Sequence, residues 1–223
     1  LFMLMSFDGK IYTGDGDERD FDKDLPTVPG VADGLGQYYA LEQDTDLCSF
    51  NTGRVMAKVG WNDRKESIAR LPVLLIIFDN QPHLTEQGVR NLVQRFQKLY
   101  LVTANSEHPA HLVSDDRLEI IRCDSPVRIA NVFETLHGKG IKDITLQSGG
   151  EMNAALLREG LVDRLSVVVA PILVGGRTTP TLVDGNSLAT LDDLRQLRAL
   201  KLEQVVVLDD SYLHVRYTIM NRQ

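Results

Sequence analysis

The sequence has few of the features that mark secreted or membrane proteins. Only two of its 223 residues are cysteines, Cys48 and Cys123, and they lie far apart, each in or beside an apolar stretch. We interpret them as buried free thiols of a reducing compartment, although they could also form one disulfide. No stretch approaches the roughly 18 consecutive apolar residues of a membrane span, and we see no signal peptide in the printed sequence. We therefore expect a cytoplasmic protein with no membrane partner.

The sequence also lacks a basic excess and the motifs of several enzyme classes. Its formal net charge is −7, which disfavours a nucleic-acid partner because such binding needs a basic face. The five histidines are scattered, and without nearby cysteines or suitably spaced carboxylates we predict no metal site. The Walker A, G-x-S-x-G, Rossmann G-x-G-x-x-G and zinc-deaminase patterns are missing. Because no nucleophile–base pair stands out, hydride transfer from a bound nicotinamide fits best, since the cofactor carries the chemistry.

What the sequence does contain is an alternation of apolar strands and amphipathic helices. With 43% hydrophobic residues, the chain is long enough for one large core or two small ones. We expect strands at 1–5, 47–50, 73–78, 99–102, 118–121, 144–146 and 165–174, helices at 31–44, 85–97, 125–138, 149–160 and 191–197, and a hairpin of 202–208 and 212–220. This order predicts a single α/β domain over residues 1–223, with three layers, a mostly parallel central sheet, helices on both faces and an antiparallel C-terminal hairpin. The hairpin is also a plausible edge for a homodimer.

One turn, Gln147-Ser148-Gly149-Gly150, lies between a short apolar strand and a helix. Ser148 and Glu151 have capping-box spacing, so we predict Ser148 as the N-cap. Each glycine costs about 1 kcal/mol relative to alanine in a helix interior, so something must offset that cost. Either the bare backbone lets a phosphate approach the helix N-terminus, or the glycines only allow tight packing of the helix on the strand. The residues alone leave both readings open.

Polar residues follow other expected strands, at the edge where open α/β sheets place ligands. Ser6-Phe7-Asp8-Gly9-Lys10 follows the first strand, and Asn51-Thr52-Gly53-Arg54 follows the second. In the second turn, Asn51 or Thr52 can cap a helix and Arg54 can hold a phosphate. Pro171 interrupts the stretch 165–174, so we expect a bend or bulge there. Each turn can also be read as a plain surface turn. The acidic loop 15–24 does not match EF-hand spacing and would be a lid if it lies over the site.

Four motifs in order make the chain resemble one known family. Met5-Ser6-Phe7-Asp8-Gly9-Lys10 is similar to the M-S-x-D-G-K opening of the reductase domain of bifunctional riboflavin-biosynthesis proteins. The segment 51–57 lies where that family has G-x-G-T-V-x-A. Gln147-Ser148-Gly149-Gly150 with 161–164 is similar to its E-G-G … L-x-D-E unit, and 170–175 to its A-P-x-x-x-G. Order and spacing hold over nearly the whole chain.

The resemblance implies a dihydrofolate-reductase-like fold, a homodimer, and NADPH as cofactor, with NADH not excluded. It implies that the cofactor pyrophosphate binds to the backbone N–H groups of Gly149, Gly150, Glu151 and Met152. It implies further cofactor contacts at Asn51, Thr52, Gly53, Arg54, Asp79, Asn80, Ser148, Pro171, Leu173 and Gly175. It places Ser6, Asp8 and Lys10 at the substrate, and Asp8 is our candidate for positioning the substrate or supplying a proton.

The predicted function is reduction of a C=N or C=O bond in a small heterocyclic substrate of the ribosylaminopyrimidine type, in riboflavin biosynthesis. The chain departs from the family at Asn51 and Arg54, which replace a glycine and a threonine, and at 58–64, where the family has D-D-P-x-L-x-x-R. No arginine lies at 79–82 or 103–106, where a 2′-phosphate would need one. The alternatives are a non-catalytic NADP(H)-binding regulatory module and a structural dimer that binds no nucleotide.

Overall fold

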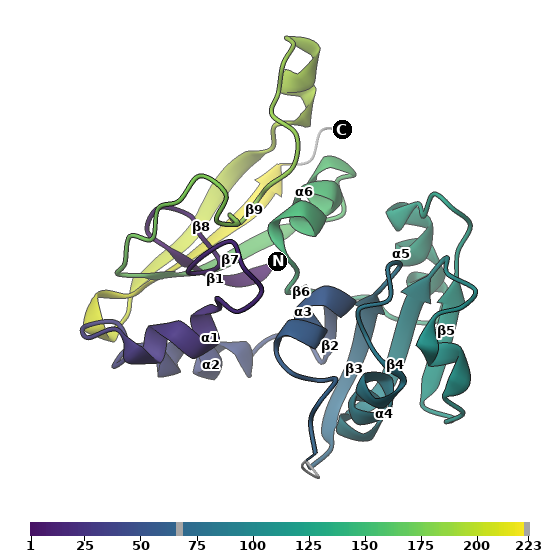
Figure 1. Cartoon of the computed structure of the whole chain (residues 1–223). Helices are drawn as coiled ribbons and strands as arrows, with labels where there is room; N and C mark the ends of the chain where they lie inside the picture. The colour runs from purple at the N-terminus through teal and green to yellow at the C-terminus, as the bar shows by residue number, and fades with distance from the viewer. Residues whose placement is uncertain (66–68, 221–223) are drawn as a thin grey trace. The chain divides into compact units, whose positions relative to one another are not determined.

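The computed structural model describes residues 1–65 and 69–220, and the chain forms two compact units (Figure 1). Unit 1 comprises Leu1–Thr45 and Gly149–Gln223, and unit 2 comprises Asp46–Ser148. The single domain expected over residues 1–223 stays a prediction. Within the described residues, no helix is both long and apolar enough to cross a membrane.

Unit 2 is a parallel sheet with helices on both faces. Its elements are β2 Cys48–Thr52, α3 Gly53–Lys58, β3 Leu71–Phe78, α4 Glu86–Arg95, β4 Phe96–Thr103, η2 Pro109–Leu112, β5 Leu118–Arg122, α5 Ile129–Gly138 and β6 Thr145–Leu146. Val89 and Leu92 of α4 pack with Ile77 in one core. Phe133 of α5 packs against Phe50, with ring centroids 5.8 Å apart. Phe50 is in register with Ile76, whose side chain lies on the sheet face opposite Ile77.

The strand order of this sheet reverses once. The strands pair in the order β5-β4-β3-β2-β6, all parallel. From β2 the chain adds β3, β4 and β5 on one side, and then returns to place β6 on the other side of β2. Ligands of open parallel sheets bind outside the carboxyl ends of the strands at such a reversal. The turns after Thr52 and after Leu146 are therefore the expected ligand edge of unit 2.

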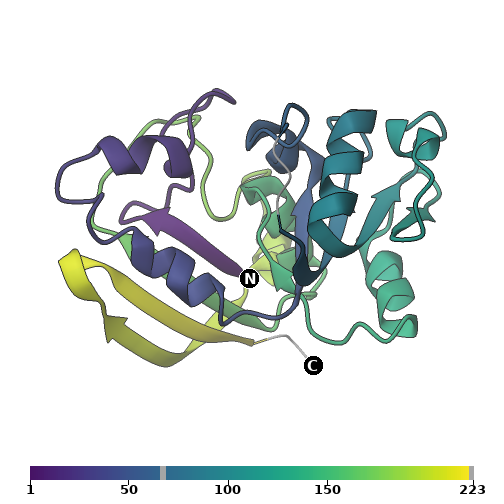
Figure 2. The ribbon, with the colours of Figure 1, turned by 90° about the horizontal axis from the view of Figure 1, so that it is seen from below.

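Unit 1 is built on a second sheet, in the order β1-β7-β9-β8. Its elements are β1 Phe2–Ser6, α1 Phe21–Asp24, η1 Leu25–Thr27, α2 Gly36–Glu42, α6 Gly150–Arg158, β7 Arg164–Ala170, η3 Asp192–Gln196, β8 Ala199–Val207, η4 Asp209–Ser211 and β9 Leu213–Met220. β1 and β7 are parallel, and β9 is antiparallel to β7 and β8. Helix α2 lies along this sheet (Figure 2). Its Tyr38 ring stacks on Phe2 at a centroid distance of 5.1 Å.

The α/β class, the parallel strands and the C-terminal hairpin β8–β9 are confirmed, while the strands divide into two hydrogen-bonded sheets. The helix expected over 31–44 is shorter and covers only α2. At its expected start, the Tyr212 hydroxyl donates a hydrogen bond to the Val31 carbonyl at 2.7 Å, so this carbonyl has a partner outside a helix. The helix expected from Ser125 begins at Ile129, where its buried apolar stripe begins. β7 ends at Ala170, because Pro171 has no N–H to continue the ladder.

The acidic segment 15–24 ends in an ordered helical turn. Asp20 is the N-cap of α1 and accepts a hydrogen bond from Asp22 N–H, and Phe21 is buried in the core of unit 1. That this segment is a lid stays a prediction.

Candidate active site

The turn after β2 packs directly on the residue that follows β3. Of the two predicted candidates, Asn51 and Thr52, it is Thr52 that caps α3, and its hydroxyl accepts a hydrogen bond from Val55 N–H at 3.4 Å. A Cβ on Gly53 would lie 2.1 Å from the Asp79 carboxyl carbon. Gly53 is therefore needed for close approach of the two strand ends. Asn51 is buried with its side-chain oxygen accepting from Thr52 N–H, and Arg54 is exposed.

Asp79 is a buried carboxylate, and both of its oxygens already accept hydrogen bonds from the protein. The predicted contact of Asp79 with the adenosine would have to compete with these bonds. Asp79 is 2% exposed and accepts from the backbone N–H groups of His83 and Leu84 at 3.0 to 3.2 Å. Nδ1 of His83 and Nε2 of His108 each lie 3.0 Å from its oxygens. Burial raises the pKa of Asp79, but these hydrogen bonds outweigh it and hold the pKa below its usual value. Neighbouring Asn80 accepts from Ala104 N–H at 2.9 Å, which ties the end of β3 to the end of β4.

The Gly-Gly turn supports the packing reading at Gly150, and the phosphate reading stays a prediction. The prediction that Ser148 caps α6 is wrong: Gly149 is the N-cap, and Ser148 is 1% exposed. A Cβ on Gly150 would lie 2.2 Å from Asp184 Oδ2 and 2.3 Å from the Thr181 carbonyl oxygen, so Gly150 serves close packing. A Cβ on Gly149 would meet no atom within 4 Å. Only Gly149 leaves bare backbone open at the N-terminus of α6, with exposed Glu151 and half-buried Met152 following in its first turn.

The loops after β1 and β7 are joined through Asp8. Its Oδ1 accepts from the Ser6 hydroxyl at 2.5 Å and from Val174 N–H at 3.1 Å, and its Oδ2 accepts from Gly175 N–H at 2.6 Å. The hydrogen bond from Ser6, together with those from Val174 and Gly175, lowers the pKa of Asp8 from 3.8 to about 2. Asp8 is therefore ionised at neutral pH and holds the 171–175 loop, which fits the positioning role and not the supply of a proton.

Lys10 lies inside this loop cluster and does not point to solvent. It is 9% exposed, and its Nζ donates to the carbonyls of Gly176 and Thr179, both at 2.8 Å. Its backbone N–H donates to the Ser6 hydroxyl at 2.9 Å. The two hydrogen bonds of Nζ give the ammonium a structural task, and the placement of Lys10 at the substrate stays a prediction. Ser6 is fully buried and links Asp8 to Lys10.

The β1–β7 loop cluster carries two exposed apolar side chains. Phe7 and Leu173 are each 72% exposed, and the Phe7 N–H donates to the Ile172 carbonyl at 2.9 Å. Pro171 is half-buried and Gly175 is exposed. The structure therefore brings Ser6, Asp8, Lys10 and the 171–175 loop together within unit 1, and Asn51–Arg54 together with Asp79 within unit 2.

Sequence reasoning missed His83, His108, Thr181 and Asp184. The spacing of four residues between Asp79 and His83 was the only local signal that these two residues would be in contact. His108 and Asp184 reach their partners through tertiary structure.

Within residues 1–65 and 69–220, no group of three or more His, Cys, Asp or Glu side chains is placed to hold a metal ion. Both cysteines are free, and burial raises the pKa of Cys48 to about 12.

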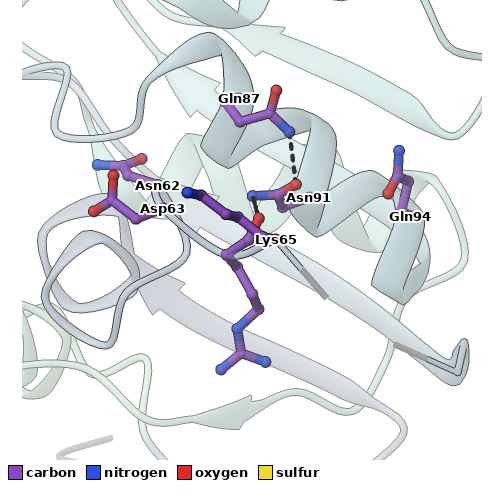
Figure 3. A pocket seen from close by; sticks show the side chains of 7 residues that line it. Asn62, Asp63, Lys65, Gln87, Asn91 and Gln94 are labelled. Carbon is purple, nitrogen blue, oxygen red and sulfur yellow. Dashed lines mark hydrogen bonds between the residues drawn. The ribbon is translucent and has the colours of Figure 1, made fainter. Parts of the chain in front are cut away.

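A polar cavity of about 560 Å³ lies on the flank of unit 2 (Figure 3). It is lined by Asn62, Asp63, Arg64, Lys65, Gln87, Asn91 and Gln94. The Asn91 amide donates to the Trp61 and Arg64 carbonyls at 2.8 and 3.0 Å, and it accepts from Gln87. None of the predicted site residues lines this cavity.

Comparisons with solved structures establish the fold. A deaminase/reductase from Thermotoga maritima gives a TM-score of 0.68 at 13% identity, covering 98% of this chain and 55% of that one. A pyrimidine reductase-like protein from Corynebacterium diphtheriae gives 0.67 at 14% identity, covering 99% and 91%. Acinetobacter baumannii RibD gives 0.66 at 16% identity, and this chain spans 57% of its length. The predicted dihydrofolate-reductase-like fold is confirmed.

Comparisons of sequence establish the family. The chain is 38% identical to the 2,5-diamino-6-ribosylamino-4(3H)-pyrimidinone 5′-phosphate reductase of Methanothermobacter thermautotrophicus, over 96% of this chain and 94% of that protein. It is 33% identical to the protein of the same name from Archaeoglobus fulgidus, over 35% of this chain and 34% of that protein. The family model described as the RibD C-terminal domain matches residues 1–212. The chain therefore belongs to the RibD C-terminal domain family, as its motifs predicted.

Proposed function

We propose that this protein is a reductase of riboflavin biosynthesis that uses NADPH to reduce a ribosylaminopyrimidine 5′-phosphate. The observation that carries the proposal is the 38% identity to the Methanothermobacter reductase over nearly the full length of both chains. In the reaction a hydride would add to the carbon of a C=N or C=O bond, and a proton to its nitrogen or oxygen. No observation favours the non-catalytic alternative.

Each unit, taken by itself, has one turn with features that suit part of a nicotinamide dinucleotide. In unit 2, the reversal of strand order places the Asn51–Arg54 turn at the edge where such sheets bind ligands. In unit 1, the open backbone at Gly149 precedes a helix of nine residues, whose N-terminal N–H groups and dipole favour a phosphate. When bound, the reduced nicotinamide would supply the hydride. We assign the pyrophosphate to the N–H groups of Gly149–Met152.

The charged residues after β1 act on the shape of the site. Asp8 stays ionised and fixes the 171–175 loop through two backbone N–H groups. Lys10 fixes the 176–179 segment through two carbonyls. We therefore assign Ser6, Asp8 and Lys10 as positioning residues that shape the surface bearing Phe7 and Leu173. The proton then comes from water.

We further propose that the protein is a cytoplasmic homodimer that pairs along β8. This strand is the outer strand of its sheet, and every described residue of β8 except Val206 is exposed. Apolar side chains on it include Leu200, Leu202, Val205 and Val207, which are 45 to 77% exposed. An edge strand that carries apolar side chains is a template for pairing with a second chain.

Turnover tests the main proposal. Purified protein is mixed with NADPH and the 2,5-diamino-6-ribosylaminopyrimidinone 5′-phosphate, and the absorbance of the reduced nicotinamide is followed. We expect substrate-dependent oxidation of NADPH. Saturable NADPH binding without any oxidation would instead support the regulatory-module alternative, and the absence of binding would remove both.

A further inference from the structure

We infer that His83 is the residue that recognises the 2′-phosphate of NADPH and thereby sets the preference for NADPH over NADH. The inference rests on the proposed function, because it requires the adenosine half of a nicotinamide dinucleotide at the carboxyl edge of unit 2. It supplies a polar ring nitrogen near the end of β3, where no arginine follows the strand.

The order β2–α3–β3 is that of the first part of a dinucleotide-binding fold. In such folds an acidic residue at the end of the second strand binds the ribose hydroxyls, and a nearby cation accommodates a 2′-phosphate. Asp79 follows β3 directly and lies against Gly53 of the turn after β2, with 2.1 Å between the Asp79 carboxyl carbon and a Cβ built on the glycine. The place of the ribose-reading residue is therefore occupied by Asp79 and its partners.

Asp79 does not present its charge to a ligand. Its side chain is 1% exposed, and both oxygens accept hydrogen bonds from His83, Leu84 and His108. A carboxylate turned outward at this point would repel a 2′-phosphate. Here the carboxylate is turned inward, and an imidazole lies on its outer side.

The hydrogen bonds assign different tasks to the two histidines. His108 is fully buried, its Nδ1 accepts from Ala110 N–H at 3.0 Å, and its Nε2 donates to Asp79. Both of its ring nitrogens are used inside the unit. His83 directs Nδ1 to Asp79 at 3.0 Å, and its side chain is 38% exposed. Its Nε2 is therefore the ring nitrogen that can meet a ligand.

The loop around His83 is held by hydrogen bonds of its backbone. The His83 N–H donates to both Asp79 oxygens, and its carbonyl accepts from the Asn62 amide at 2.9 Å. The Asn62 side-chain oxygen also accepts a hydrogen bond from the N–H of Thr85, and Thr85 is the N-cap residue of α4. With Nδ1 held by Asp79, Nε2 of His83 is the ring nitrogen left to hydrogen-bond a phosphate oxygen of the cofactor.

Cofactor discrimination by variants tests this assignment. NADPH and NADH are titrated separately into the whole protein, by fluorescence of the reduced nicotinamide, for the wild type, H83Q, H83R and H137Q. His137 is an exposed histidine at the end of α5 and is the matched control. Loss of one charge-assisted hydrogen bond should weaken NADPH binding by H83Q about 10- to 100-fold and leave NADH binding unchanged. H83R should restore the preference, and H137Q should behave as the wild type.

Several outcomes would overturn the assignment. Equal weakening of both cofactors in H83Q would mean that His83 only holds the loop, and so would an unchanged NADPH affinity. If R64Q loses NADPH affinity while H83Q does not, the cation of the flank cavity is the phosphate ligand. As an independent readout, the phosphorus resonance of the bound NADP⁺ 2′-phosphate should shift between wild type and H83Q. Wild-type protein that binds NADH as tightly as NADPH would overturn only this inference, whereas binding of neither would also remove the proposed function.

Discussion

Adjacent glycines at the start of α6 should lose different amounts of stability when each is replaced by alanine. At Gly150 a methyl group would lie 2.2 Å from Asp184 Oδ2 and 2.3 Å from the Thr181 carbonyl oxygen. That neighbouring backbone is not free to move, because Asp184 N–H donates to the Gly150 carbonyl at 3.0 Å. The Asp184 carboxylate also accepts from the amide and the hydroxyl of Thr181 at 3.1 and 2.6 Å. Gly149 meets no such obstacle.

The size of the effect follows from these contacts. Overpacking costs about 1–3 kcal/mol, and each displaced hydrogen bond about 1 kcal/mol. The higher helix propensity of alanine returns at most about 1 kcal/mol. We therefore expect Gly150→Ala to lower the free energy of unfolding by about 2 kcal/mol, which is a fall in Tm of about 4–8 °C for a chain of this size.

Scanning calorimetry of the two variants measures this difference. Gly149→Ala should lose less stability than Gly150→Ala, because it gives up only the preference of an N-cap for glycine over alanine and meets no packed neighbour. It should bind NADPH more weakly if the pyrophosphate lies on this backbone. A Gly150→Ala protein as stable as the wild type would refute the packing argument. Equal losses in both variants would show that any side chain at this helix start is costly, whatever its neighbours.

Two further predictions concern buried and exposed carboxylates. Gly53→Ala should destabilise the protein by about 1–3 kcal/mol, because its Cβ would lie 2.1 Å from the carboxyl carbon of buried Asp79. Gly138→Ala, at an open helix end, is the control. Equal melting temperatures for the two variants would contradict this prediction. Asp8 has a folded-state pKa of about 2 against an ordinary 3.8, so its stabilisation is present above about pH 4 and is lost as the pH falls through about 2. Asp8→Asn should make the decline of Tm in that pH range less steep. The effect should be small, because the side chain is exposed. A decline as steep as in the wild type would show that the hydrogen bonds of Asp8 do not stabilise the fold.

Local patterns were enough to predict most of the elements. Apolar runs such as 73–78 gave buried parallel strands, because a strand covered on both faces needs no polar alternation. The stripe of Val89, Leu92 and Val93 gave α4, which begins after the N-cap Thr85. The alternating C-terminal segment gave the hairpin β8–β9. These features depend on residues close in sequence, so the sequence could reveal them.

The remaining features depend on partners distant in sequence. Ser148 has the spacing of a capping residue, but it is buried and Gly149 caps α6. Nothing near Asp79 indicates that His108 would occupy its carboxylate from a loop 29 residues away. The two glycines of the Gly-Gly turn look equivalent in sequence, and only the position of Asp184 separates the packed glycine from the open one. The division of the strands into two sheets also follows from tertiary pairing, which strand patterns do not encode.

Transfer of a label from the cofactor tests the central claim most directly. NADPH deuterated at C4 of the nicotinamide, on one face and then on the other, is incubated with the protein and the ribosylaminopyrimidinone 5′-phosphate, and the product is analysed by mass spectrometry. Our account predicts that one of the two labelled cofactors places one deuterium on carbon in the product, and that no label is lost to the water. Product without deuterium from either cofactor, or no product while NADPH binds, would contradict it.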